Sequence, residues 1–151
     1  MRISAKADYA IRAAVELAGA GEEPVKGEKL AEAQDIPLQF LEHILLELKH
    51  ARLVRARRGA RGGYWLARDP EEITLANVIR AVEGPLANIQ DQAPEQTEYR
   101  GDAEHLRDVW IAVRASLRRV LEEVTVADLR DGTIPEEVLQ MTKDEGAWVT
   151  R

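Results

Sequence analysis

The fold is decided by residues 37–67, which read PLQFLEHILLELKHARLVRARRGARGGYWLA. Pro37 suits the first turn of a helix, where its missing N–H costs nothing. The apolar residues that follow repeat with the period of a helix: Leu38, Leu41, Ile44, Leu45 and Leu48. This segment therefore predicts a helix that packs by one side and leaves its other side free to contact a partner.

The second half of the stretch predicts a β-hairpin. Val54–Arg58 and Gly63–Ala67 hold β-compatible residues, and the glycine-rich turn Gly59-Ala60-Arg61-Gly62 joins them. Arginines stand at the tip among glycines, which let a backbone approach another molecule closely.

Further helices are expected on both sides of this stretch. Ala5–Ala20 and Lys26–Gln34 precede it, and Thr74 is placed to cap a helix that runs to about Glu83. Helix, short helix, Pro-started helix and hairpin follow one another in the order of a winged helix-turn-helix. The predicted fold class is mostly α with a small β-hairpin wing, followed by a long dimerisation helix.

Four regions are predicted along the chain: a winged domain at 1–85, a linker or sensor-type loop at 86–101, a dimerisation helix region at 102–131 and a C-terminal tail at 132–151. Apolar residues in the third region are spaced by four and three, as in a coiled-coil seam. The predicted seam consists of Leu106, Trp110, Val113, Leu117, Val120 and Val124. Such a stripe can be core, but the winged domain already has helices to bury, so a two-fold interface is favoured.

The composition indicates an ordinary soluble globular protein. The 151 residues are 45% apolar and 32% charged, and they contain no cysteine. No apolar run approaches the roughly 20 residues that span a bilayer, and Met1–Tyr9 lacks the apolar stretch of a secretory signal. We therefore expect a cytoplasmic protein without disulfides or a thiolate-held metal.

The charge is unevenly distributed. The net charge of the chain is −6, but residues 1–68 hold 12 basic and 9 acidic side chains. Lys49–Arg68 contains seven basic residues and no acidic one. A charge run is often only a solvated face, yet this pattern favours a basic binding half joined to an acidic half with another role.

The ordered set of elements gives the basic half a function. A winged helix-turn-helix places its third helix in the major groove, where base edges are distinguishable, and arginines of the wing reach phosphates or the minor groove. No catalytic triad, phosphate loop or metal-ligand spacing is present, and the three histidines are too dispersed to share a metal. The sequence predicts a DNA-binding protein that is not an enzyme.

Several motifs resemble the Rrf-two family of winged-helix transcription regulators, which includes iron–sulfur, nitric-oxide and cysteine-metabolism regulators. The resemblance covers about residues 1–130. It rests on residues 1–10, 40–45, 53–55, 58–64, 73–75 and 78–84 and on Trp110.

The resemblance implies a homodimer that regulates transcription, as a repressor, from a pseudo-palindromic site whose halves lie roughly 34–36 Å apart. The predicted DNA-binding residues are Arg2, Lys6, Gln39, Phe40, Glu42, His43, Lys49, Arg57, Arg58, Gly59, Arg61, Gly62 and Tyr64. Glu42 is expected to accept a hydrogen bond from a cytosine amino group. Alternatively, it pairs with a neighbouring basic side chain such as Arg55. The alternative function is a protein-interaction module of the same fold that has lost DNA binding.

Three residues depart from the family pattern, two in the wing and one after the third helix. The wing has Ala60 and Arg61 where the family has Pro and Gly, which makes its path harder to predict. Arg52 replaces a glycine after the third helix, at a position where a left-handed conformation costs on the order of 1 kcal/mol.

Cluster-bearing relatives carry three cysteines where this chain has Gln92, Glu98 and Glu104, and a fourth ligand where it has Arg107. Carboxylates and amides are hard oxygen ligands and a guanidinium is no ligand, so we expect no iron–sulfur cofactor. Regulation then remains open between a small molecule at the 86–101 loop, a partner protein there, and constitutive repression.

Overall fold

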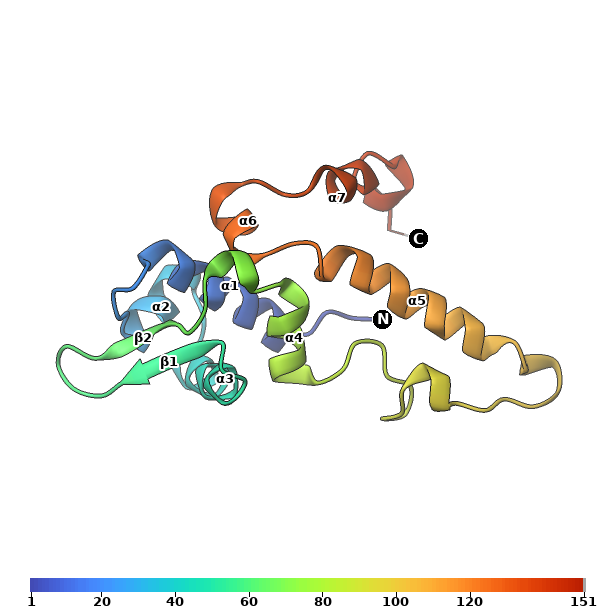
Figure 1. The fold of residues 1–151 in the computed structure, drawn as a ribbon, viewed down its shortest axis with the longest axis horizontal. Helices are drawn as coiled ribbons and strands as arrows, with labels where there is room; N and C mark the ends of the chain where they lie inside the picture. The colour runs from blue at the N-terminus through green and yellow to red at the C-terminus, as the bar shows by residue number, and fades with distance from the viewer. Residues whose placement is uncertain (151) are drawn as a thin grey trace.

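The computed structural model describes residues 1–150, and it is mostly helical with one two-stranded antiparallel hairpin, as predicted (Figure 1). The helices are α1 (Ala5–Ala20), α2 (Gly27–Gln34), α3 (Leu38–His50), α4 (Leu75–Glu83), α5 (Leu106–Leu121), α6 (Val126–Asp131) and α7 (Glu136–Met141). The strands are β1 (Val54–Arg57) and β2 (Gly63–Leu66), and 3-10 turns lie at Pro70–Glu72 (η1), Pro94–Gln96 (η2), Gly101–Ala103 (η3) and Glu145–Trp148 (η4). Within residues 1–150 no helix is both long and apolar enough to cross a membrane.

Small side chains on α1 allow the other helices to pack closely around it. Ala10, Ala13 and Ala14 are buried, and α1 contacts α2, α3, α4 and α6. The predicted apolar stripe of α3 fills the space beside it with fully buried side chains at Leu41, Ile44, Leu45 and Leu48. Each of these contributes about 1.5–3 kcal/mol by leaving water. The buried stripe fixes which side of α3 remains exposed.

The chain returns to the winged domain after α5. The N–H of Leu75 donates to the carbonyl of Val124 at 2.9 Å, and that of Val126 donates to Ile73 at 2.9 Å. Val124 and Val126 are 4% and 0% exposed. Apolar residues in the last part of the predicted dimerisation region, 102–131, therefore close the core of the winged domain.

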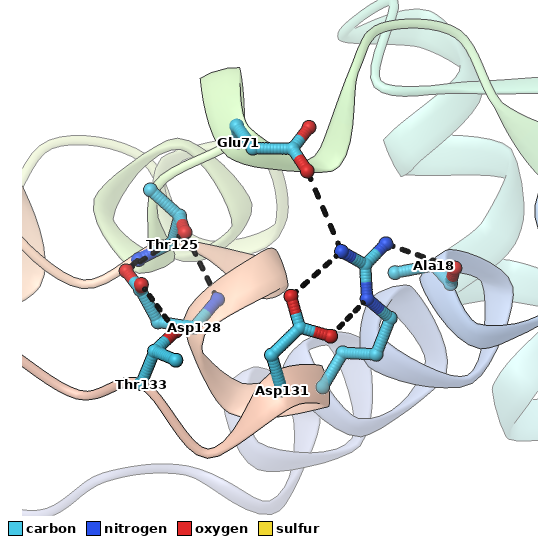
Figure 2. Close-up of polar contacts among 7 residues, drawn as sticks. Ala18, Glu71, Thr125, Asp128, Asp131 and Thr133 are labelled. Carbon is cyan, nitrogen blue, oxygen red and sulfur yellow. Dashed lines mark hydrogen bonds and ion pairs between the residues drawn. The ribbon is translucent and has the colours of Figure 1, made fainter.

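A polar network holds α6 in place (Figure 2). The Thr125 hydroxyl accepts from the N–H of Asp128 at 3.1 Å, and the Asp128 carboxylate accepts from the N–H of Thr125 at 2.8 Å. These two bonds cap the first turn of α6 reciprocally. The hydrogen bonds from Thr125 lower the pKa of Asp128.

Arg130 connects α6 to two other elements. Its guanidinium lies 2.7 Å from Asp131, 3.4 Å from Glu71 in η1 and 3.4 Å from the carbonyl of Ala18 near the end of α1 (Figure 2). The pKa of Asp131 is lowered by its hydrogen bond to Arg130. A cation beside the last carbonyls of a helix also favours the helix dipole, so Arg130 stabilises the end of α1.

Helix α5 extends away from the winged domain, and residues 86–101 run alongside it (Figure 1). The indole N–H of Trp110 donates to the Tyr99 hydroxyl at 3.0 Å, and Arg114 pairs with Glu95 at 2.7 Å. The pKa of Glu95 is lowered by a backbone hydrogen bond and by Arg114. The predicted linker is thus an irregular but packed segment, which we call the strap (residues 86–101).

The turn after α3 confirms the expected backbone strain at Arg52. Arg52 has a φ of 60°, in the left-handed region. The N–H of Leu53 donates to the carbonyl of Leu48 at 2.9 Å, which ends α3 and starts the chain toward β1.

We expect Arg52→Gly to raise the free energy of unfolding by about 0.5–1 kcal/mol, because glycine adopts a positive φ without a steric cost. Urea unfolding followed by circular dichroism measures this change. Arg55→Gly is the matched control: it removes the same charged side chain from a strand and is expected to destabilise. An unchanged or lower midpoint for Arg52→Gly would contradict the assigned strain.

Candidate nucleic-acid interface

A groove of about 540 Å³ lies between the starts of α2, the outer side of α3 and the wing. Basic side chains lie along it, with apolar surface between them. The lining residues are Lys26, Gly27, Glu28, Glu42, Leu46, Lys49, Ala56, Arg57, Arg58, Gly59, Gly63 and Tyr64. Six residues predicted to contact DNA from the sequence (Glu42, Lys49, Arg57, Arg58, Gly59 and Tyr64) therefore share one surface feature.

The exposed side of α3 carries polar side chains without internal partners. Gln39, Glu42 and His43 are exposed. Within residues 1–150, the Glu42 carboxylate makes no hydrogen bond or ion pair. Arg55, its alternative partner, does not line the groove that Glu42 lines. A free carboxylate on this helix remains available to accept from a base edge.

Phe40 is held partly against α1. It is 39% exposed, and its ring meets that of Tyr9 edge to face with centroids 5.6 Å apart. The Arg12 guanidinium lies 4.9 Å from the Tyr9 centroid, so Tyr9 is fixed between α1 and α3. Phe40 therefore presents only part of its ring to a partner.

Glycines fix the path of the wing. The N–H of Gly62 donates to the carbonyl of Gly59 at 3.0 Å and closes the tip. A Cβ at Gly62 would lie 2.0 Å from the carbonyl oxygen of Arg57, so no other residue fits there. Despite the two departures from the family sequence, Arg61 is accommodated, since its carbonyl accepts from the Arg57 guanidinium at 3.1 Å.

Strand β2 of the wing is anchored to the segment before α2. Val25 and Tyr64 exchange two backbone hydrogen bonds of 2.9 and 2.8 Å. The Lys26 amine donates to the carbonyl of Gly59, near the tip. These contacts set the distance between the wing and α3, and they bring Lys26 into the groove.

The basic residues of the wing are free of acidic partners. Among residues 1–150, none of the seven basic side chains between Lys49 and Arg68 has a carboxylate oxygen within 4.0 Å. Elsewhere Arg80 and Arg114 each contact one carboxylate, and Arg130 contacts two. Unpaired cations gathered on one surface favour a polyanionic ligand.

Seven predicted contacts do not line the groove: Gln39, Phe40 and His43 on α3, Arg61 and Gly62 at the wing tip, and Lys6 and Arg2. Lys6 pairs with Glu47 of α3 at 2.8 Å, so it already has an internal partner. Arg2 is exposed ahead of α1. Conversely, Lys26 lines the groove but was not predicted from the sequence. The pairing of Val25 with Tyr64 brings Lys26 beside the wing, and no local sequence pattern predicts that contact.

A second, apolar groove of about 780 Å³ lies along α5. Val113, Leu117 and Val120 of the predicted seam line it, together with Ile79 of α4 and Ile3. Trp110 faces the strap instead, and Val124 lies beyond the end of α5 in the core. None of the 16 residues of α5 is buried within the chain.

Comparisons with known proteins agree with this arrangement. The chain is 51% identical over 145 residues to a Mycobacterium tuberculosis protein assigned as an HTH-type transcriptional regulator, covering 95% of this chain and 90% of that protein. It is 32% identical to the HTH-type transcriptional regulator CymR of Bacillus subtilis, covering 93% and 98%.

Solved structures show the same likeness. The structure of CymR, the global cysteine regulator of B. subtilis, superposes with a TM-score of 0.71 at 31% identity, covering 88% of this chain and 98% of that one. The structure of IscR from T. potens gives 0.66 at 29% identity, covering 100% and 93%. A sequence profile described as "Rrf2: Iron-dependent Transcriptional regulator" matches residues 3–132. With its helix-turn-helix, its wing and its basic groove, this chain belongs to the Rrf2 family of DNA-binding transcriptional regulators.

Proposed function

We propose that the chain acts as a homodimeric repressor that reads a pseudo-palindromic DNA site and does so without a cysteine-held iron–sulfur cluster. The observation that carries this proposal is the groove between α3 and the wing, whose cations lack acidic partners while Glu42 stands free among them. Phosphates match the cations, and a base edge with an amino group matches the carboxylate. A dimer bound across a promoter represses by occupying it.

In this proposal the two elements beside the groove, α3 and the wing, contact different parts of the DNA. The exposed side of α3 enters the major groove and reads bases through Gln39, Glu42 and His43. Arg58 and Gly59 at the wing tip contact the adjacent minor groove. Lys49 and Arg57 neutralise the phosphates between these two contacts.

Selection of bound duplexes from a random pool at moderate salt tests this proposal, and we expect a two-fold symmetric site to be enriched. Arg58→Ala should then lower affinity about tenfold for all sequences and reduce the salt slope by about one, because it removes a cation from the minor groove, which has phosphates on both sides. Glu42→Ala should instead change the preferred base at one position of each half-site.

Glu137→Ala is the matched control for Glu42→Ala, since it removes an exposed carboxylate from α7, away from the groove. Failure to enrich any duplex would contradict the proposal and would favour the protein-interaction module.

The apolar groove along α5 supports the dimer. An amphipathic helix of 16 residues with no buried residue leaves its apolar face to water unless a partner covers it. Val113, Leu117 and Val120 recur at coiled-coil spacing on that face. A second copy of this chain offers the same face, as a two-fold interface requires.

Leu117→Glu should therefore yield a monomer and lower DNA affinity together, because a buried carboxylate in the interface has no partner. Light scattering and DNA titration measure the two effects. Ala115→Glu adds the same charge to an exposed position of α5 that does not line the groove, and it should leave the dimer intact. A dimeric Leu117→Glu protein would place the interface elsewhere.

The side chains present do not fit the iron cofactor that the family description names. The chain has no cysteine, and residues 1–150 contain no group of three His, Cys, Asp or Glu side chains placed to hold a metal. Arg107, at one position where cluster-bearing relatives carry a ligand, is an exposed guanidinium with no lone pair to donate.

Purified protein prepared under anaerobic conditions is accordingly expected to be colourless. Visible absorption from a protein-bound cluster, removed by a chelator and restored by iron and sulfide, would refute this expectation.

The strap is the proposed place of regulation. It contacts α5 through Tyr99 with Trp110 and through Glu95 with Arg114, so a ligand that reorders it changes the seating of α5. The two recognition helices of a dimer would then change their spacing. A small molecule, a partner protein and constitutive repression all remain compatible with these contacts.

A further inference from the structure

The two faces of the wing sheet carry different residues. Ala56 pairs with Tyr64 across the strands, and both line the groove beside α3. Their neighbours Arg55 and Trp65 pair with each other and do not line it. Because side chains alternate along a strand, Arg55 and Trp65 stand on the opposite, outer face of the wing.

A basic hollow lies along β1 and reaches from this outer face to Val54 and Ala56 of the other face. A depression of about 540 Å³ is lined by four cations, Lys49, Arg52, Arg55 and Arg68, around the indole of Trp65. No acidic residue lines this hollow. None of the four cations has a carboxylate partner among residues 1–150, as shown above, so their charges are balanced only by solvent ions.

The hollow is continuous with the proposed DNA-binding groove. Lys49 lines both. Arg57 lines the groove and also a neighbouring depression that holds Arg55, Arg68 and Trp65 together with the acidic Glu22, Asp69 and Glu71. The cations therefore form one band that passes around the wing rather than stopping at its inner face.

The dimensions of the DNA minor groove indicate what this band of cations binds. The minor groove is about 6 Å wide and has a sugar–phosphate strand on each side. A hairpin that inserts its tip there has one strand against its inner face and the other against its outer face. The cations of the protein groove beside α3 contact the first DNA strand, so the cations on the outer face of the wing are left to face the second DNA strand.

We infer that the outer face of the wing, through Arg52, Arg55 and Arg68, binds phosphates of the second DNA strand across the minor groove. The inference rests on the proposed placement of the wing in that groove. It extends the DNA-binding surface to residues outside the predicted set and predicts a longer footprint than α3 and the wing tip give alone.

Two duplexes carrying the selected site test the inference with the full-length protein. One ends at the outer edges of the recognised half-sites, and the other continues for about ten base pairs on each side, roughly one helical turn. We expect the native chain to bind the longer duplex about tenfold more tightly. Arg55→Gln with Arg68→Gln should remove that gain, reduce the salt slope by about two and leave binding to the short duplex unchanged.

Arg100→Gln with Arg107→Gln is the matched control, since it removes two exposed charges near the start of α5, away from the wing. It should retain the gain from the longer duplex. Phosphate-ethylation interference on the longer duplex should also mark flanking phosphates for the native chain and not for the wing variant.

Other outcomes separate this inference from the proposed function. Equal affinity of the native chain for both duplexes, or equal losses on both by the wing variant, would overturn the inference and leave the groove assignment standing. Saturable calorimetric binding of inorganic pyrophosphate without DNA, lost in the wing variant, would replace it with a small-anion site. Failure to enrich any duplex would overturn both.

Discussion

Two backbone hydrogen bonds, from Leu75 to Val124 and from Val126 to Ile73, determine how the rest of the molecule is arranged. They join the segment before α4 to the segment after α5, fifty residues later, and they bury Val124 and Val126 in the core. Because both ends of the 75–124 excursion are tied to one place, α5 cannot change its direction without disturbing the winged domain. The caps at Thr74 and Thr125 start two helices from this same junction.

The winged domain holds α3 and the wing at a fixed distance, and it leaves the basic side chains between them without acidic partners. The buried stripe of α3 orients its polar side outward, and the pairing of Val25 with Tyr64 sets the wing opposite it. The basic side chains between these elements have no internal partners, so no ion pair must break when a polyanion arrives. Internal pairing is used instead around α5 and α6, where Arg114 and Arg130 hold the architecture together.

Most of the winged domain could be predicted from local patterns, because its signals lie within single elements. The periodicity of α1 and α3, the cap at Thr74 and the glycines of the wing all confirmed their expected structures. The residues whose surroundings could not be predicted depend on contacts between distant segments. Val124 continues the seven-residue pattern of α5, yet α5 ends at Leu121 and the chain bends into the core. Lys26 reaches the groove, and Lys6 leaves the set of free cations, only through partners far along the chain.

The separation of charge also affects how the protein meets DNA. Free cations are concentrated on the wing and the end of α3, whereas residues 69–151 hold twice as many acidic as basic side chains, 18 against 9. Such a molecule has a large electric dipole, and the field of a duplex turns it before contact. Encounters that begin with the acidic half toward the phosphates are repelled, so collisions are biased toward the orientation in which α3 faces the helix. The same bias persists while the protein slides along unrelated DNA sequence, and it shortens the search for the specific site. The effect is greatest at low salt, where the charges are screened least.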